Sequence, residues 1–170
     1  SVVACPLERT NTGDNTPAVL YTRLCAGDRI RLLAMPKGFG SENISRIKTF
    51  NPTAQVEEIV EFVYDTVYQA GGNPCPPLVI GVGLGGSFDY AAVLAKKALA
   101  REVGVHNERY RELEERILRR VNESGVGPSG LGGDTTALWA AVEAYPTHIA
   151  GLPVAVNISC HATRHAEKII

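Results

Sequence analysis

A cysteine held between prolines limits what this chain can fold into more than any other segment does. Residues 71–77 read Gly-Gly-Asn-Pro-Cys-Pro-Pro, so that Cys75 lies between Pro74 and Pro76. A proline fixes its own φ, and the residue before a proline is biased towards extended conformations. The sequence therefore predicts that Cys75 lies on a stiff turn.

The residues after this turn predict a buried strand. Residues 78–82 are nearly all apolar and are bounded by turn residues, which is typical of a strand inside a sheet. The glycines at 85 and 86 then allow a tight exit with free backbone N–H groups. We expect a thiolate and several N–H donors at one end of a strand, an arrangement that indicates a functional site.

Composition indicates one globular domain. The 170 residues are 45% apolar with a formal net charge of -1, which is enough for one substantial core. The 17 basic and 18 acidic residues are interspersed, so neither nucleic acid nor a membrane surface is expected as a partner. No apolar run approaches the roughly 20 residues of a membrane span, and we expect no leader, because the first residues do not show a basic segment followed by an apolar one. A soluble, cytoplasmic protein is expected.

The cysteines argue against a disulfide framework. They form no CxxC pair and show no regular spacing, so free thiols or metal ligands fit better; they are Cys5, Cys25, Cys75 and Cys160. The chain opens on Ser1 rather than Met, and we expect it to be a piece of a longer protein, truncated at its N-terminus.

Hydrophobic periodicity predicts an α/β fold, with mixed strands and packed helices in a single domain. The helix expected at 107–122 is highly charged, and we expect its charges to form a solvated surface. Cys25 is expected to be a small buried side chain near a turn between two strands. The expected helices cover 55–70, 89–101, 107–122 and a segment capped at 134–136 and ending at Val142, and the expected strands cover 18–24, 30–35, 78–82 and 154–158.

Two glycine-rich loops could serve a ligand. Residues 36–43 combine glycines with one lysine, and such a loop can wrap an anion with its backbone amides, although a mobile linker fits the residues equally well. A second glycine loop covers residues 125–133. Three of the four histidines lie between 148 and 165, beside Cys160. We expect the two loops and the two strand-flanking cysteines to face the same space.

Several chemistries remain open on the residues alone. Residues 81–86 match GxGxxG, but no second strand ending in an acid follows about 20 residues later, so a dinucleotide site is disfavoured. A zinc site from Cys160, His161 and His165 lacks a second close pair of ligands. A nucleophilic Cys75 or Cys160 paired with a histidine has no local signature. Widely separated single cysteines also suit an iron–sulfur cluster.

Five motifs, in the same order along essentially the whole chain, resemble the iron–sulfur (class I) fumarate hydratases and the related L-tartrate dehydratases. They are residues 11–18, 37–43, 72–77, 127–133 and 147–162. By this resemblance residues 1–170 form a domain of the fumarate hydratase alpha type, that is, most of an alpha subunit or an N-terminal region.

The resemblance implies a 4Fe-4S cluster held by three cysteines, two of which are Cys75 and Cys160. The third belongs to a motif upstream of Ser1, and Cys5 is not assigned to it. One iron is left open as a Lewis acid for a hydroxyl and a carboxylate of the substrate. The resemblance further implies that His148 transfers a proton, that His161 and His165 support the cluster, and that the substrate binds at Gly38, Gly40 and Ser41.

The resemblance also implies partners and a reaction. A beta subunit or C-terminal domain would supply further substrate-binding cations, and an oligomer is expected. The expected reaction interconverts fumarate and L-malate, as in the tricarboxylic acid cycle. The alternatives are an L(+)-tartrate dehydratase and a non-catalytic remnant of the same fold. Phe39 departs from the glycine that is commonest in the family at this position in the first loop.

Overall fold

The computed structural model describes all of residues 1–170 and divides them into two compact units. The smaller unit comprises Ser1–Arg31 and Ile169–Ile170. It has no buried residue, and its regular pairing is one bridge between Val3 and Asn11 and the mutual backbone hydrogen bonds of Ile30 and Ile170. The strand expected at 18–24 is wrong, because these residues find neither a ladder partner nor a face to bury. Cys25 is likewise exposed rather than buried.

The larger unit, Leu32–Lys168, contains a four-stranded sheet in the order β2-β5-β3-β4. Strand β3 runs parallel to β4 and antiparallel to β5, and β2 is antiparallel to β5. A separate two-stranded sheet pairs β1 with β6, so the strand near residue 30 does not form the expected hairpin with 18–24. The strands are β1 (Arg31–Ala34), β2 (Arg46–Phe50), β3 (Leu78–Gly85), β4 (Ala137–Tyr145), β5 (Leu152–Cys160) and β6 (Ala166–Ile169).

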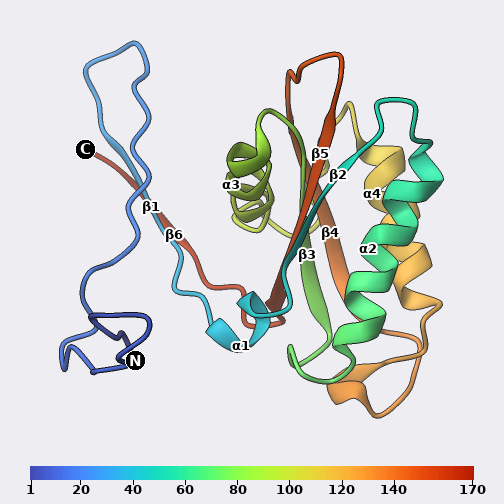
Figure 1. Ribbon diagram of the computed structural model, residues 1–170, viewed down its shortest axis with the longest axis horizontal. Helices are drawn as coiled ribbons and strands as arrows, with labels where there is room; N and C mark the ends of the chain where they lie inside the picture. Colours follow the sequence, from blue (N-terminus) through green and yellow to red (C-terminus); the bar gives the residue numbers. More distant parts are fainter. The chain divides into compact units, whose positions relative to one another are not determined.

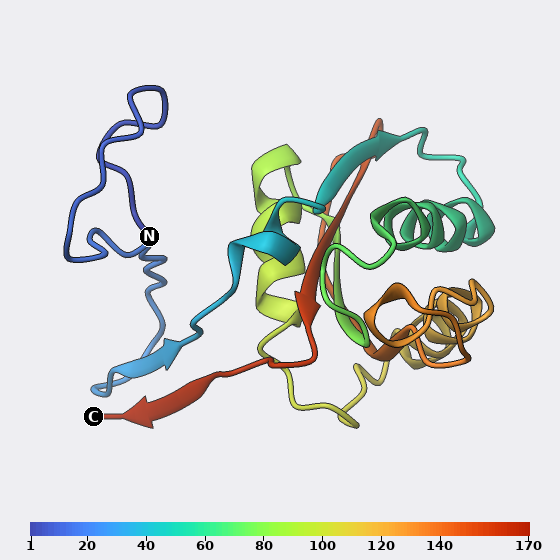
Figure 2. The same ribbon diagram turned by 90° about the horizontal axis from the view of Figure 1, so that it is seen from below.

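Helices cover both faces of the four-stranded sheet, which confirms the α/β class. Figures 1 and 2 show α2 (Val56–Ala70) and α4 (Arg111–Asn122) on one face and α3 (Phe88–Ala98) on the other. These three helices confirm the helices predicted at 55–70, 89–101 and 107–122. A short helix α1 (Phe39–Glu42) and a 3-10 turn η1 (Pro128–Gly130) lie in the two glycine loops. No helix is both long and apolar enough to span a membrane.

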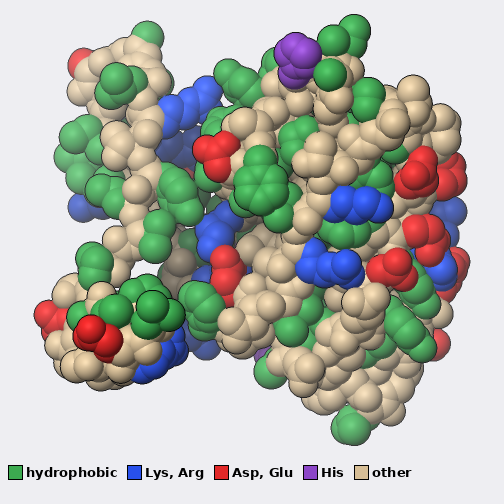
Figure 3. Space-filling model, viewed as in Figure 1, with side chains coloured by type: hydrophobic (Ala, Val, Ile, Leu, Met, Phe, Trp, Pro, Cys, Tyr) green, Lys and Arg blue, Asp and Glu red, His purple; other side chains and the backbone are tan.

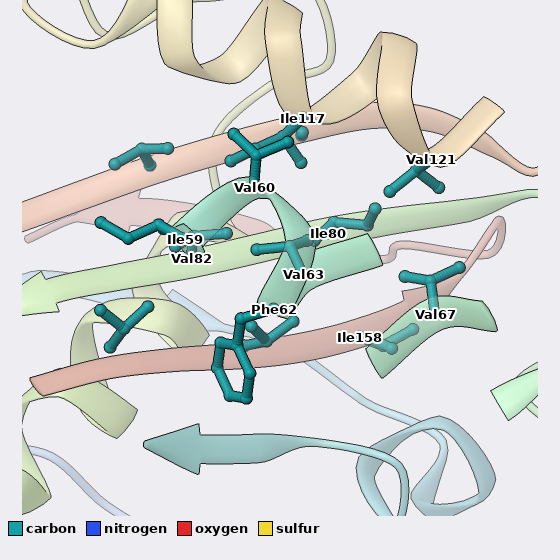
Figure 4. Packing of buried hydrophobic residues seen from close by; sticks show 14 of the residues in the cluster. Ile59, Val60, Phe62, Val63, Val67, Ile80, Val82, Ile117, Val121 and Ile158 are labelled. Atoms are coloured by element: carbon teal, nitrogen blue, oxygen red, sulfur yellow. The ribbon is translucent and has the colours of Figure 1, made fainter. Parts of the chain in front are cut away.

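The two faces of the sheet pack differently. Towards α2 and α4, large aliphatic side chains such as Val63, Ile80 and Ile117 fill the core (Figure 4). Towards α3, the strand carries glycines: a Cβ added to Gly83 would lie 2.0 Å from the Ala91 carbonyl oxygen. The GxGxxG pattern thus contains glycines that let α3 approach β3 closely, which is a packing role.

The helix expected between 134 and 142 is wrong, because this segment forms β4. Thr136 and Ala137 donate their backbone N–H groups to the Asn122 side chain, at 2.8 Å each, and the Thr136 carbonyl accepts from Leu78. The apolar residues after Ala137 then pair with β3, where burial in the sheet outweighs the local capping signal. Trp139, in β4, is buried.

One charge of α4 is not on the solvated surface that the sequence predicts. Basic and acidic side chains lie side by side over the α2 and α4 side in Figure 3, and Arg116 pairs with Glu57 there at 2.6 Å. Glu114, however, is 1% exposed and accepts from Arg101 at 2.6 Å and from the backbone N–H of Val142 at 2.8 Å. This carboxylate satisfies a backbone donor of the edge strand β4, which has no strand on that side.

Candidate functional site

The Cys75 turn exposes its thiol, whereas the prolines on either side of it are buried. Pro74 and Pro76 are buried, whereas Cys75 is exposed and its thiol is free. Cys75 has φ of 58°, in the left-handed region that a non-glycine residue adopts only when its surroundings hold it there. The turn predicted from the prolines is therefore confirmed, but Cys75 does not have the extended conformation that the following proline favours. This backbone strain is consistent with a functional role.

The second glycine loop holds this turn from one side. The backbone N–H of Ser129 donates to the Pro76 carbonyl oxygen at 2.9 Å. Gly130 lies against Gly72 so closely that a Cβ added to Gly130 would be 2.6 Å from the Gly72 Cα. The loop and the turn interlock through backbone atoms, which explains why glycine is needed at both positions.

The second thiol lies at the same end of the sheet. Cys160 is the last residue of β5 and pairs in register with Leu78, the first residue of β3. Cys75 precedes Leu78 by three residues. The two cysteines thus lie at the same end of the sheet, which we call the cysteine end. They are far apart in the sequence, and the antiparallel pairing of β3 and β5 places them at the same end of the sheet.

Two thiols fit an iron–sulfur cluster as part of its ligand set, because such clusters take cysteine thiolates. No three side chains of the kinds that bind metals converge anywhere in the chain, so these residues do not complete a set by themselves. His161 is exposed and His165 is half-buried after Cys160, and the His165 Nδ1 atom is buried without a hydrogen-bond partner. His165 therefore has an unused polar atom near the second thiol in sequence.

The first glycine loop is joined to the cysteine end by Lys37. The Lys37 Nζ atom donates to the Ile158 carbonyl oxygen at 2.6 Å, two residues before Cys160, and to the Ser41 Oγ atom at 3.1 Å. Gly38 and Gly40 are exposed, and nothing within 4 Å would meet a Cβ at either. Ser41 is buried and donates its hydroxyl to the Gly38 carbonyl oxygen at 3.0 Å. The open backbone of the loop, rather than the Ser41 hydroxyl, is free to meet a ligand.

A group of charged side chains contacts this loop, and the sequence did not predict it. Glu42 pairs with Lys37 at 3.0 Å and with Lys96 at 2.5 Å, and accepts from Asn157 at 3.0 Å. Burial alone would raise the pKa of Glu42, but the hydrogen bonds from Lys96, Asn157 and Lys37 outweigh it and hold the pKa below its usual range. Burial lowers the pKa of Lys37, and the pairing with Glu42 offsets part of this shift. The only sequence signal was one lysine within a glycine loop.

His148 lies at the other end of the sheet. It is exposed in the turn between β4 and β5, where the neighbouring Thr147 donates to the Gly86 carbonyl oxygen at 2.9 Å. Its Nδ1 atom accepts from the Ala150 backbone N–H at 3.1 Å, which leaves Nε2 free. We call this the histidine end; β3, with its eight residues, separates it from the cysteine end by about 20 Å or more. One chain does not bring His148 to its own cysteines.

The glycines at 85 and 86 also lie at the histidine end, because they end the strand that Cys75 precedes. The expectation of a thiolate and glycine-loop donors at one end of this strand is therefore wrong for Gly85 and Gly86. That expectation relied on closeness in the sequence, whereas the residues before and after an extended strand lie at opposite ends of the sheet. The donors near Cys75 come instead from the loop at 125–133, as the Ser129 contact shows.

Known proteins resemble this chain along nearly all of its length. A protein of Methanocaldococcus jannaschii, provisionally named L(+)-tartrate dehydratase subunit alpha, is 45% identical over 168 residues, which cover 95% of this chain and 58% of that protein. The L(+)-tartrate dehydratase subunit alpha of Escherichia coli K12 is 32% identical over 162 residues, covering 94% and 54%. The chain thus spans a little over half the length of these relatives.

The family comparison agrees with the motifs found in the sequence. The model of the family described as fumarate hydratase (Fumerase) matches residues 1–169. Because this match extends over almost the whole chain, the chain belongs to the fumarate hydratase (Fumerase) family.

Proposed function

We propose that this chain is the cluster-binding part of an iron–sulfur hydro-lyase that dehydrates L(+)-tartrate. The observation that carries the proposal is the pairing of β3 with β5, which places the free thiols of Cys75 and Cys160 at one end of the sheet. The names of the relatives favour tartrate as the substrate. Interconversion of fumarate and L-malate is the second candidate, favoured by the description of the family.

The proposal gives the cysteine end two tasks. Cys75 and Cys160 would hold two corners of a 4Fe-4S cluster, which when bound supplies a Lewis acid that polarises a substrate hydroxyl. The exposed backbone at Gly38 and Gly40 would orient a carboxylate of the substrate beside it. Ser41 would act indirectly, because its buried hydroxyl holds the loop through Gly38 and Lys37.

His148 would supply the proton transfer, and its position implies a second copy of the chain. His148 is exposed at the histidine end, its Nε2 atom forms no hydrogen bond, and it lies a strand length away from the cysteines of the same chain. We propose that His148 of one copy completes the site at the cysteine end of another. This requires an oligomer in which each site takes residues from two copies.

The remaining parts would come from outside these residues. The relatives are named as alpha subunits, which supports a beta subunit as partner. We propose that a third cluster ligand lies upstream of Ser1, and that the partner supplies further cations for the substrate carboxylates.

The test uses the full-length protein with its partner subunit, reconstituted with iron and sulfide without oxygen. We expect three ligand cysteines, the broad visible absorption of one cluster, and kcat/KM for L(+)-tartrate at least about 10-fold above that for L-malate and fumarate, a difference of about 1.4 kcal/mol in transition-state binding. A preference for malate and fumarate supports the second candidate. If the full-length protein takes up no cluster, the chain is a non-catalytic remnant of the fold.

A further inference from the structure

The ammonium group of Lys37 makes its hydrogen bonds within the protein. Its side chain is only 9% exposed. The three ammonium donors match three acceptors, which are the Ile158 carbonyl oxygen at 2.6 Å, the Ser41 Oγ atom at 3.1 Å and the Glu42 Oε2 atom at 3.0 Å. A lysine in such a site has no donor left for a substrate. Its contribution is therefore to hold other groups in place.

The three acceptors belong to two different parts of the proposed site. Ser41 and Glu42 lie in α1, within the loop that contains Gly38 and Gly40. Ile158 lies in β5, two residues before Cys160. The contact between Lys37 and Ile158 spans 121 positions in the sequence, and it is a charge-assisted hydrogen bond, which is among the stronger kinds.

We infer that Lys37 is a positioning residue that fixes the loop at 36–43 to the end of β5, so that the substrate carboxylate and the cluster ligand Cys160 keep one relative geometry. The inference rests on the proposed function of both segments. A shift of about 1 Å in such a geometry costs roughly 100-fold in rate, so a single buried contact is enough to matter.

The chain contains a matched control. Lys96 also pairs with Glu42, at 2.5 Å, but it extends from α3 and forms no hydrogen bond with the loop backbone or with β5. Lys96→Met removes one positive charge from Glu42, as Lys37→Met does. The two variants therefore differ in the link to Ile158 and Ser41, and not in the charge that is lost.

The experiment compares Lys37→Met and Lys96→Met in the full-length, reconstituted protein with its partner subunit. For Lys37→Met we expect kcat/KM to fall about 10- to 100-fold, mainly through KM, together with loss of the change that substrate causes in the electron paramagnetic resonance spectrum of the reduced cluster. For Lys96→Met we expect both quantities to stay within about 2-fold of the unchanged protein. Equal losses in the two variants would overturn the inference.

A milder variant covers the case in which Lys37→Met does not fold. Ser41→Ala removes one acceptor of the ammonium together with the hydrogen bond to the Gly38 carbonyl oxygen, and it leaves the Ile158 contact. It should therefore raise KM by a smaller factor and leave the iron content unchanged. No change in KM and in the spectrum for Ser41→Ala would count against the link. Failure of the proposed function is recognised separately, because the unchanged protein would then hold no cluster or turn over none of the three acids.

Discussion

The two ends of the four-stranded sheet differ in how they hold the residues placed there. At the cysteine end, Cys75 lies on a strained turn that interlocks with the loop at Gly130, and Lys37 ties a third segment to β5. At the histidine end, His148 stands exposed on a short turn and is fixed by one hydrogen bond from Ala150. The cysteine end is thus fixed by contacts between three segments of the chain, whereas the histidine end presents an exposed side chain.

We expect the largest difference between the two ends of the sheet when a proposed cluster ligand is removed. Cys160→Ser at the cysteine end should abolish cluster binding and turnover, because it removes a proposed ligand. The exposed Cys25 of the smaller unit provides the control, and Cys25→Ser should retain both. Iron and acid-labile sulfide analysis with the visible spectrum checks this. Loss of the cluster in Cys25→Ser would show that the ligands are misassigned.

The next effect tests the histidine end. His148→Asn should lower turnover by about 10²–10⁴-fold, the usual loss for a general acid–base group, while the cluster spectrum stays intact. Asparagine can keep the hydrogen bond from the Ala150 N–H, so the turn should persist. If the cluster were lost as well, His148 would be a structural residue.

Mixing two inactive variants shows whether the ends meet between copies. A dimer with one Cys160→Ser chain and one His148→Asn chain contains one site with both an intact cysteine end and an intact histidine, if the histidine comes from the other copy. Random pairing should then restore about one quarter of the activity. Pairing within one chain predicts no recovery at all.

A smaller effect comes from two glycines with similar constraints at opposite ends. Gly130 has φ of 74°, and a Cβ there would meet the Gly72 Cα at 2.6 Å; Gly85 has φ of 80°, and a Cβ there would meet the Tyr145 carbonyl oxygen at 2.2 Å. Each substitution by alanine should lower the free energy of unfolding by about 1–3 kcal/mol, as overpacking does. Only Gly130→Ala should also speed loss of iron, because it displaces the Cys75 turn. Equal iron loss would remove the distinction between the ends.

The smallest effect is a dependence on pH. Glu42 lies at the cysteine end and Glu143 on β4; burial would raise the pKa of Glu143, but hydrogen bonds from Lys97 and Arg101 outweigh it, so the pKa values of both carboxyls lie below the usual 4.5. The stability that each contributes is present above about pH 4.5 and is lost as the pH falls through its lowered pKa.

Urea unfolding of the cluster-free protein at pH 7 and pH 3.5 measures this dependence. Glu42→Gln and Glu143→Gln should each reduce the difference in unfolding free energy between the two pH values by at most about 1 kcal/mol, since both carboxylates are partly screened by solvent. An unchanged pH difference in Glu143→Gln would show that its ion pairs with Lys97 and Arg101 contribute nothing in solution.

Local patterns in the sequence predicted the elements whose stability is mostly local. The helix at 55–70 follows from its 3.6-residue apolar period, and the buried strand at 78–82 follows from its composition and its flanking turns. The segment after residue 134 forms β4 instead of the expected helix because it pairs with β3, which lies more than 50 residues earlier in the chain. Glu114 carried a usable signal, because it lies three and seven positions before the buried Ile117 and Val121, on the apolar face of its helix.

The sequence by itself determined that Cys75 lies on a stiff turn and that a buried strand follows it, because prolines and apolar runs act on the backbone within a few residues. Only the tertiary structure decided which residues share a site. The pairing of β3 with β5 places Cys160 at the same end of the sheet as the Cys75 turn, and His148 lies at the opposite end. Strand register depends on contacts between residues distant in sequence, and a period of two along one strand does not say which strand lies beside it.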